Sequence, residues 1–166
     1  MAMDQERERI QEDLRGLLDG DVRCDDLFVQ MYANDASIYE IRPLGVIRPR
    51  HVSDVVMAVQ YAAANNYSIH ARGSGSGVAG ESPGSGLVLD FSHHMRRVIS
   101  IEEDRVCIQP GVIHGQLNKL LERRGQVFGP DPANSVVSTM GSVLALNSCG
   151  SRWLKYGTPR DLVESM

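Results

Sequence analysis

The stretch RGSGSGVAG at residues 72–80 decides the fold, because it places four glycines directly after a short strand-like segment, Tyr67 to Ala71. Glycines two residues apart leave backbone N–H groups uncovered, and alternating left- and right-handed residues can curl them into an anion-binding nest. Ser74 and Ser76 add hydroxyl donors, and Arg72 adds a positive charge. The loop therefore suits a diphosphate. A flexible, solvated hairpin loop is the alternative that a glycine–serine run leaves open.

The spacing Gly75-x-Gly77-x-x-Gly80 satisfies the G-x-G-x-x-G pattern of Rossmann folds, but the residues after it do not fit that fold. A Rossmann fold needs a helix that starts inside the motif and aims its N-terminus at the phosphates. Pro83, with glycines on either side of Ser85, forbids a stable helix there. The sequence also lacks the Gly-Lys-Ser/Thr of a Walker loop. Any grip on phosphate must therefore come from the loop itself.

Apolar spacing along the rest of the chain predicts short strands mixed with helices. We expect helices over residues 4–19, 25–33, 53–65 and 113–124, an extended segment over 39–50, strands over 67–71, 87–91, 96–101 and 105–109, a short helix or tight coil over 139–147, and a turn entering a strand over 156–166. The strands between 87 and 109 follow one another too closely for crossover helices, which excludes a doubly wound sheet. The predicted fold class is α+β, with small mixed sheets flanked by helices.

Two of these helices carry more detailed predictions. Ser53 is the predicted N-cap of the first, with Asp54 at its positive end. Its predicted inward face consists of Val55, Val56, Val59, Ala62 and Ala63. In the helix over 113–124, Gly125 is the predicted stop, and the inward residues are Ile113, Leu117, Leu120 and Leu121.

A second run of small residues lies near the end of the chain. It comprises Asp131-Pro132-Ala133-Asn134, Thr139-Met140-Gly141-Ser142 and Ala145-Leu146-Asn147-Ser148-Cys149-Gly150. Small side chains at this density let another surface approach the backbone, where N–H and hydroxyl donors can bind the edge of a heterocycle. Tight helix–helix packing through small residues explains the pattern equally well.

Composition excludes several classes of function. The net charge of −4, with mixed signs, offers no basic stripe for a nucleic acid. The three cysteines are far apart and form no C-x-x-C pair, so we expect free thiols in a reducing compartment. The charged N-terminus does not suit a signal peptide, and no apolar run has the roughly 20 residues of a membrane span. We therefore expect a cytoplasmic protein without a transmembrane segment.

Histidines 93 and 94, with His114 as a third ligand, suggest a metal site, but adjacent histidines on a strand or turn are expected to point in opposite directions and rarely bind one ion together. We therefore expect surface or core roles for them and no metal. Arg152, Lys155 and Tyr156 are expected to have structural roles at the edge of the domain.

Several short motifs recur in a fixed order. They are Arg48-Pro49-Arg50-His51-Val52-Ser53-Asp54-Val55, the loop from Arg72 to Gly80, Gln109-Pro110-Gly111-Val112, Gly129-Pro130-Asp131-Pro132, Thr139-Met140-Gly141-Ser142, Asn147-Ser148-Cys149-Gly150 and Tyr156-Gly157. Their order and spacing over residues 40–166 resemble the FAD-binding domain shared by vanillyl-alcohol oxidase, p-cresol methylhydroxylase, D-lactate dehydrogenase and glycolate oxidase. The resemblance implies a p-cresol methylhydroxylase-type FAD-binding fold, incomplete at the C-terminus, over residues 39–166, preceded by a helical extension over 1–38.

The resemblance also implies which residues bind FAD. Backbone amides of Gly73 to Gly77, with the hydroxyls of Ser74 and Ser76, would hold the pyrophosphate beside the charge of Arg72, and Gly80 would let the loop turn back. Gly111 and the turn at Asp131 and Pro132 would lie near the adenine–ribose half. The path toward the flavin ring would be lined by Thr139, Gly141, Ser142 and Ser148.

The chain departs from the family pattern at three points. Ser74 replaces the middle glycine of a triple glycine, Ser76-Gly77 replaces a Thr-Ser pair, and Ser142 replaces a second glycine. Family members with covalent FAD carry a histidine where this chain has Ser76. Serine cannot form that bond, so the resemblance implies dissociable FAD, with His70 in a packing role.

The implied activity is oxidation of a D-2-hydroxy acid, such as D-lactate, glycolate or 2-hydroxyglutarate, by a longer protein. In it the base and the carboxylate clamp would lie in a C-terminal substrate domain beyond this fragment, and the electron acceptor is left open. Residues 32–46 resemble a branch of long proteins that carry a C-terminal iron–sulfur module, where an iron–sulfur cluster would reside. Two alternatives stay open: FAD chemistry on a sugar, nucleotide-sugar or aryl alcohol, and a non-catalytic module that binds another phosphate ligand.

Overall fold

The computed structural model describes residues 2–166, with side chains from Gln5 onward. The chain forms two compact units, the first ending at His94 and the second beginning at Met95. Within the described residues, no helix is both long and apolar enough to cross a membrane.

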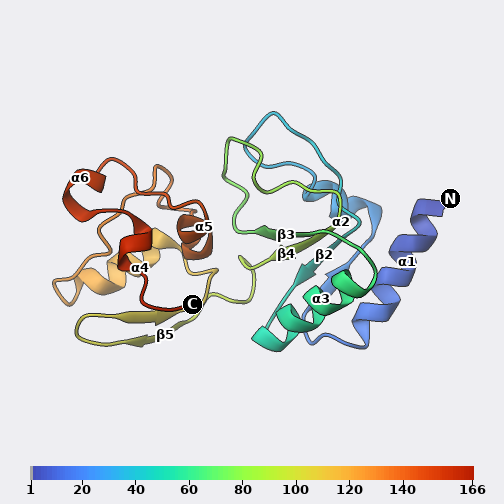
Figure 1. Cartoon of the computed structure of the whole chain (residues 1–166), viewed down its shortest axis with the longest axis horizontal. Helices are drawn as coiled ribbons and strands as arrows, with labels where there is room; N and C mark the ends of the chain where they lie inside the picture. The colour runs from blue at the N-terminus through green and yellow to red at the C-terminus, as the bar shows by residue number, and fades with distance from the viewer. Residues whose placement is uncertain (1) are drawn as a thin grey trace. The chain divides into compact units, whose positions relative to one another are not determined.

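The first unit is built on a four-stranded sheet in the order β1-β2-β4-β3 (Figure 1). Its strands are β1 (Asp21–Arg23), β2 (Gly45–Arg48), β3 (Ile69–Arg72) and β4 (Leu87–Asp90). β1 is antiparallel to β2, whereas β2, β4 and β3 are parallel. Because parallel strands end at the same edge, the glycine loop after β3 and the bend after β4 leave the sheet on the same side.

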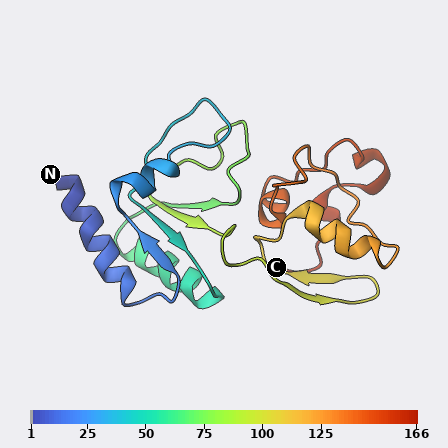
Figure 2. The same cartoon turned by 180° about the vertical axis from the view of Figure 1, so that it is seen from behind.

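Helices cover both faces of this sheet. α1 (Ala2–Arg15) and α3 (Val52–Ala64) pack on one face, and the short α2 (Asp26–Met31) packs on the other (Figure 2). Alternation along each strand explains the two layers, since successive side chains point to opposite faces. The first layer buries Ile10, Leu14, Leu18, Ile47, Ala58, Ala62, Leu87 and Leu89, and the second buries Val29, Tyr32, Val46 and Val88.

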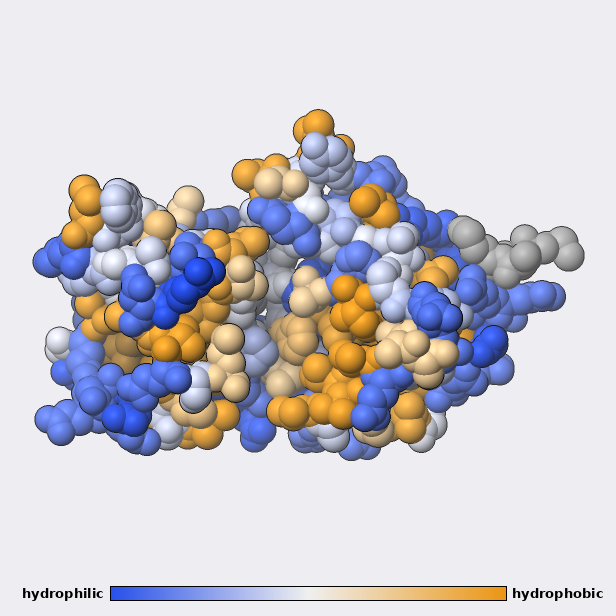
Figure 3. Space-filling view, viewed as in Figure 1, coloured by the Kyte–Doolittle hydropathy of each residue, from blue (hydrophilic) through white to orange (hydrophobic). Residues whose placement is uncertain are grey.

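The N-terminal end of α3 corrects two predictions. The N-cap is His51 rather than Ser53, because the carboxylate of Asp54 accepts hydrogen bonds from the backbone N–H groups of Arg50 and His51. The predicted inward face was also wrong in part. Val56 and Val59 are 47% and 45% exposed, and hydrophobic residues gather on the surface over α3 in Figure 3. Ala63 is exposed as well, whereas Val55 and Ala62 face inward as predicted. Ala58, which was not predicted, also faces the sheet, and these small residues let the helix lie close to it.

The second unit joins a hairpin to two helices. β5 (Val98–Ile101) and β6 (Val106–Ile108) are antiparallel, followed by α4 (His114–Glu122) and α5 (Met140–Ala145). Its core contains Val112, Leu117, Leu121 and Met140, against which Val98, Ile101, Val106, Ile108 and Phe128 pack. Leu120 is 39% exposed, so its predicted inward position was wrong. Gly125 has a positive φ of 69° just beyond α4, as a helix stop requires.

The end of the chain differs from the prediction. Residues 156–166 contain no strand; instead α6 (Trp153–Tyr156) is followed by Gly157 and a 3₁₀ helix, η1 (Pro159–Leu162). The side chain of Asp161 accepts hydrogen bonds from the N–H and hydroxyl of Thr158, which caps η1. This short-range capping explains why a helical turn forms where extended chain was expected.

Burial lowers the expected reactivity of the Cys24 thiol. Burial raises its pKa to about 11, from 9.0. We therefore expect iodoacetamide at neutral pH to label Cys24 about 100-fold more slowly in the folded chain than in urea, since two pH units change the thiolate fraction about 100-fold. Mass spectrometry of peptides measures both rates, with the exposed Cys107 as the internal control.

The same shift predicts a loss of stability at high pH. The unfolded thiol ionises near pH 9, whereas the folded one stays protonated to about pH 11. The stabilisation is therefore fully present below pH 9 and is lost as pH rises from about 9 to about 11. Urea unfolding of the wild type and Cys24→Ser from pH 9 to pH 11 measures how the free energy of unfolding changes with pH. An equal decrease with pH in both proteins would contradict the prediction.

Candidate functional site

The glycine loop is irregular backbone that connects two parallel neighbouring strands. It runs from Gly73 to Gly86 between β3 and β4, and no helix begins in it. This confirms the rejection of a Rossmann fold. Within residues 2–166, no protein acceptor receives a hydrogen bond from the backbone N–H groups of residues 73–77. The loop therefore presents donors that an anionic ligand can use.

At three glycines of the loop, a side chain of another residue occupies the position that a Cβ atom would take. A Cβ on Gly75, whose φ is +67°, would lie 2.3 Å from the Arg72 guanidinium. One on Gly77 would meet the carboxylate of Glu81, and one on Gly80, whose φ is +83°, would meet the ring of Tyr39 at 2.5 Å. The positive φ of Gly75 and Gly80 disfavours any side chain there, whereas a side chain at Gly77 would displace the flexible Glu81 carboxylate.

The side chain of Arg72 lies between Gly75 of the loop and residues 32–34. Its Nη2 donates to the carbonyl oxygen of Asn34 at 2.8 Å, and its guanidinium lies 5.1 Å from the ring centroid of Tyr32. Burial lowers the pKa of this arginine. The guanidinium is thus held by neighbouring carbonyls, and its contact with a phosphate stays a prediction.

Residues 32–41, here called the strap, lie against the glycine loop. The Ala36 N–H donates to the carbonyl of Gly77 at 3.1 Å, and the Ser82 N–H donates to Asp35 Oδ2 at 3.4 Å. Burial raises the pKa of Asp35, but hydrogen bonds from Ser37 and Ser82 outweigh that effect and lower it overall. The strap therefore fixes the far side of the loop through a carboxylate that stays ionised.

A polar network lies next to the loop at the end of β4. The Tyr32 hydroxyl donates to Asp90 Oδ2 at 2.6 Å, and Arg48 Nε donates to the same hydroxyl at 3.0 Å. Ser92 donates to the other oxygen of Asp90 through its N–H and its hydroxyl. Burial raises the pKa of Tyr32 to about 12. Tyr32, Asp90 and Ser92, together with Gly73 and Ser74, line a small cavity of about 170 Å³.

In the second unit, two predicted segments come together. The Gly141 N–H donates to the Pro110 carbonyl at 2.8 Å, and the Met140 N–H donates to the Val112 carbonyl at 2.7 Å. A Cβ on Gly141 would lie 2.9 Å from Pro110, so this close approach requires glycine. Gly111, which lies between Pro110 and Val112 in the sequence, is buried, and its N–H donates to the Met95 carbonyl.

Two hydroxyls are paired at the start of α5. Thr139 is its N-cap and accepts from the Ser142 N–H, while the Ser142 hydroxyl donates to the Thr139 carbonyl at 2.8 Å. Ser148 follows Asn147, whose φ of 50° turns the chain after α5. Thr139 is buried, whereas Ser142 and Ser148 are half-buried, so both serines keep some access to solvent.

The turn at Asp131 closes on the chain after α5. Asp131 accepts from the Arg152 N–H at 2.9 Å and from the Ser151 hydroxyl at 2.9 Å, and these bonds, with the nearby guanidinium, lower its pKa. A Cβ on Gly150 would lie 1.9 Å from the Asp131 carbonyl oxygen. Pro132 is buried beside them. Arg152 therefore anchors this turn, in line with its expected structural role.

Sequence reasoning did not find the residues that hold these segments in place. The contacts of Tyr32, Asp35 and Tyr39 with the loop join residues about 40 positions apart, and no local pattern marks them. In the second unit, the buried His114 contacts the Pro130 carbonyl through Nε2 at 2.8 Å. Burial lowers the pKa of His114, which favours the neutral ring in this contact.

A family model described as the FAD binding domain matches residues 43–166. The chain belongs to this family. In this FAD-binding domain, residues 73–77 present amide N–H groups that no acceptor among the described residues receives, and the Arg72 guanidinium and the Glu81 carboxylate lie beside Gly75 and Gly77.

Two of the proteins that are similar in sequence to this FAD-binding domain are described as a dehydrogenase and as a subunit of an oxidase. D-2-hydroxyglutarate dehydrogenase of Escherichia coli (strain K12) is 36% identical over 136 residues, which cover 79% of this chain and 13% of that protein. Glycolate oxidase subunit GlcD of Bacillus subtilis (strain 168) is 35% identical over 138 residues, covering 80% of this chain and 29% of that protein. The domain thus spans less than a third of either relative.

Solved structures are similar over most of the domain. Alkyldihydroxyacetonephosphate synthase has a TM-score of 0.80 at 26% identity, covering 93% of this chain and 32% of that one. 6-Hydroxy-D-nicotine oxidase from Arthrobacter nicotinovorans has a TM-score of 0.71 at 29% identity, covering 85% and 31%. The predicted α+β fold of the p-cresol methylhydroxylase type is confirmed.

Proposed function

We propose that this domain binds FAD non-covalently, with the glycine loop holding the pyrophosphate. Backbone amides from Gly73 to Gly77 and the hydroxyls of Ser74 and Ser76 supply the hydrogen bonds, while Arg72 adds positive charge from beneath. The observation that carries this proposal is the set of uncovered amides in residues 73–77. Gly80, packed on Tyr39, returns the chain to the sheet.

The second unit supplies the other proposed contacts. We assign the adenine–ribose half to Gly111 and to the turn at Asp131 and Pro132, and the path toward the flavin to Thr139, Gly141, Ser142 and Ser148. The half-buried hydroxyls of Ser142 and Ser148 support this assignment, because both keep access to solvent; Ser148 can donate to a ligand, and Ser142, whose proton goes to the Thr139 carbonyl, can accept from one. The division at residue 38 between a helical extension and the domain stays a prediction.

For the longer protein we propose oxidation of a D-2-hydroxy acid. Bound FAD supplies two-electron redox chemistry, and this domain's part is to hold and orient it. The support is the identity of 36% and 35% to relatives described as D-2-hydroxyglutarate dehydrogenase and glycolate oxidase subunit. Electron transfer to a C-terminal iron–sulfur module and a cytoplasmic location are further parts of the proposal.

A second candidate is FAD chemistry on another substrate class. This second candidate is supported by the similarity in structure to alkyldihydroxyacetonephosphate synthase, at a TM-score of 0.80, because that protein's name is not that of a hydroxy-acid dehydrogenase. Screening the longer protein for flavin bleaching by D-2-hydroxy acids, sugars, nucleotide-sugars and aryl alcohols separates the two. Bleaching by a sugar or aryl alcohol alone would overturn the hydroxy-acid proposal but not the binding of FAD.

We expect the purified chain to bind FAD more tightly than FMN, because FMN lacks the second phosphate and the adenosine. Fluorescence titration with FAD, FMN and ADP measures the order. Denaturation with acid should release all the flavin into the supernatant, since Ser76 offers no ring nitrogen for a covalent bond. A preference for FMN would contradict the assignment of the loop to a pyrophosphate, and flavin retained in the pellet would contradict non-covalent binding.

A further inference from the structure

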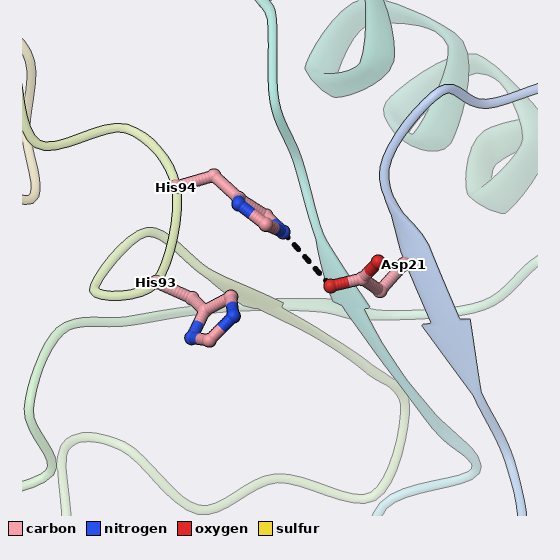
Figure 4. Close-up of side chains that lie close together, drawn as sticks. All are labelled: Asp21, His93 and His94. Atoms are coloured by element: carbon pink, nitrogen blue, oxygen red, sulfur yellow. Dashed lines mark hydrogen bonds and ion pairs between the residues drawn. The ribbon is translucent and has the colours of Figure 1, made fainter.

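Three potential metal ligands converge at one edge of the first unit. Asp21 is the first residue of β1, and His93 and His94 lie in the bend after β4. One ligand atom from each residue lies within 4.8 Å of the other two. Figure 4 shows both imidazole rings on the side of the bend that faces Asp21. The expectation that adjacent histidines on a strand or turn point apart is wrong here, because the ring centroids of His93 and His94 lie 4.4 Å from each other.

We propose that Asp21, His93 and His94 form a zinc-binding site. Two imidazole nitrogens and one carboxylate oxygen are donors that Zn²⁺ prefers, and three protein ligands leave a fourth position for water. Magnesium and calcium prefer all-oxygen sites, so this donor set selects against them. The site lies wholly in the first unit and does not depend on the proposed binding of FAD.

The present contacts show how the metal would enter. His94 Nε2 lies 2.8 Å from Asp21 Oδ2, a hydrogen-bond distance at which a proton lies between the two atoms. Zinc replaces that proton, since metal ligands must be deprotonated. The exposed His93 ring packs edge-on against the His94 ring at a centroid distance of 4.4 Å, and it must turn from this contact to reach a Zn–N distance of about 2.0–2.1 Å.

Arg50 is the neighbouring cation that opposes zinc. Its Nη2 lies 3.4 Å from Asp21 Oδ1, the oxygen that does not face His94. This leaves Oδ2 as the metal ligand, while Arg50 orients the carboxylate from the other side, as partners of ligating carboxylates commonly do. The Arg50 side chain is 48% exposed, so water screens its repulsion.

The bound metal would connect an edge strand to the middle of the sheet. β1 pairs only with β2, whereas the bend follows the central strand β4. A metal bridge between residues 21 and 94 would therefore stabilise the edge strand and fix residues 92–94 beside Asp90.

The test is zinc titration of the untagged chain by isothermal titration calorimetry, with matched variants. We expect one zinc per chain, and at least about 100-fold weaker binding in His93→Ala, since changes one contact further from a metal already cost about 10–100-fold. Asp21→Asn and His94→Ala should weaken binding similarly. The control His51→Asn removes an exposed histidine outside the cluster and should bind zinc as the wild type does.

A second measurement separates ligand loss from misfolding. Zinc at 100-fold above its dissociation constant should raise the thermal midpoint of the wild type by about 5–10 °C and leave that of His93→Ala unchanged. Because His93 is exposed, this variant should keep the metal-free midpoint of the wild type. Equal zinc affinity in wild type and His93→Ala, or an equal loss in His51→Asn, would overturn the proposal.

Discussion

Gly75→Val should weaken FAD binding by about 10–100-fold while the chain stays folded. Two effects act together. The φ of +67° at this position costs a β-branched residue about 1–3 kcal/mol, and its Cβ would lie 2.3 Å from the Arg72 guanidinium. The arginine must then leave its bonds to the strap, and the open amides of residues 73–77 lose their arrangement. At 1.4 kcal/mol per tenfold, these costs correspond to the stated range.

Fluorescence titration of FAD measures the affinity, and circular dichroism measures the folded fraction. The matched control is Gly16→Ala, because a Cβ there meets nothing within 4 Å and its φ is ordinary. It should bind FAD as the wild type does. An unchanged affinity in a folded Gly75→Val chain would remove the glycine loop from the proposed site.

Asp54→Ala should destabilise the chain by about 3–5 kcal/mol, the largest effect we expect from a single polar side chain. The Asp54 carboxylate is fully buried and accepts from three backbone N–H groups, those of Asp19, Arg50 and His51. Alanine removes the shared acceptor of these three part-buried hydrogen bonds, at about 1–3 kcal/mol each. The thermal midpoint should fall by about 10 °C or more.

Asp54→Asn is the informative companion variant. The single carbonyl oxygen of asparagine can accept only part of these hydrogen bonds. We therefore expect the free energy of unfolding of Asp54→Asn to lie between that of the wild type and that of Asp54→Ala. Urea unfolding gives both free energies of unfolding. A loss under about 1 kcal/mol for Asp54→Ala would show that water replaces the carboxylate, contrary to the argument from burial.

The glycine loop and the fold class could be predicted because their causes are local. Pro83 and the glycines around it exclude a helix from sequence chemistry alone, and the structure has none there. Spacing between strands likewise excluded crossover helices after β4. These arguments needed only a few neighbouring residues.

The partners of the loop could not be predicted, because they are distant in the sequence. Tyr32 and Arg72 are 40 residues apart, and nothing in either segment marks the contact. The inward face of α3 was misjudged for a related reason. Apolar spacing around Val56 and Val59 fits a helix face, but which side meets the sheet depends on tertiary packing. Contacts with FAD in both units stay predictions.

The strap changes where this domain can be cut. The family match begins at residue 43, after the strap, α1 and β1. A chain trimmed to that point would uncover Ile47 and Leu87, which now pack with Ile10 and Leu14, and would also free the glycine loop on one side. Fusions and domain exchanges that take the matched residues as a module would therefore carry the cofactor loop without the segment that shapes it.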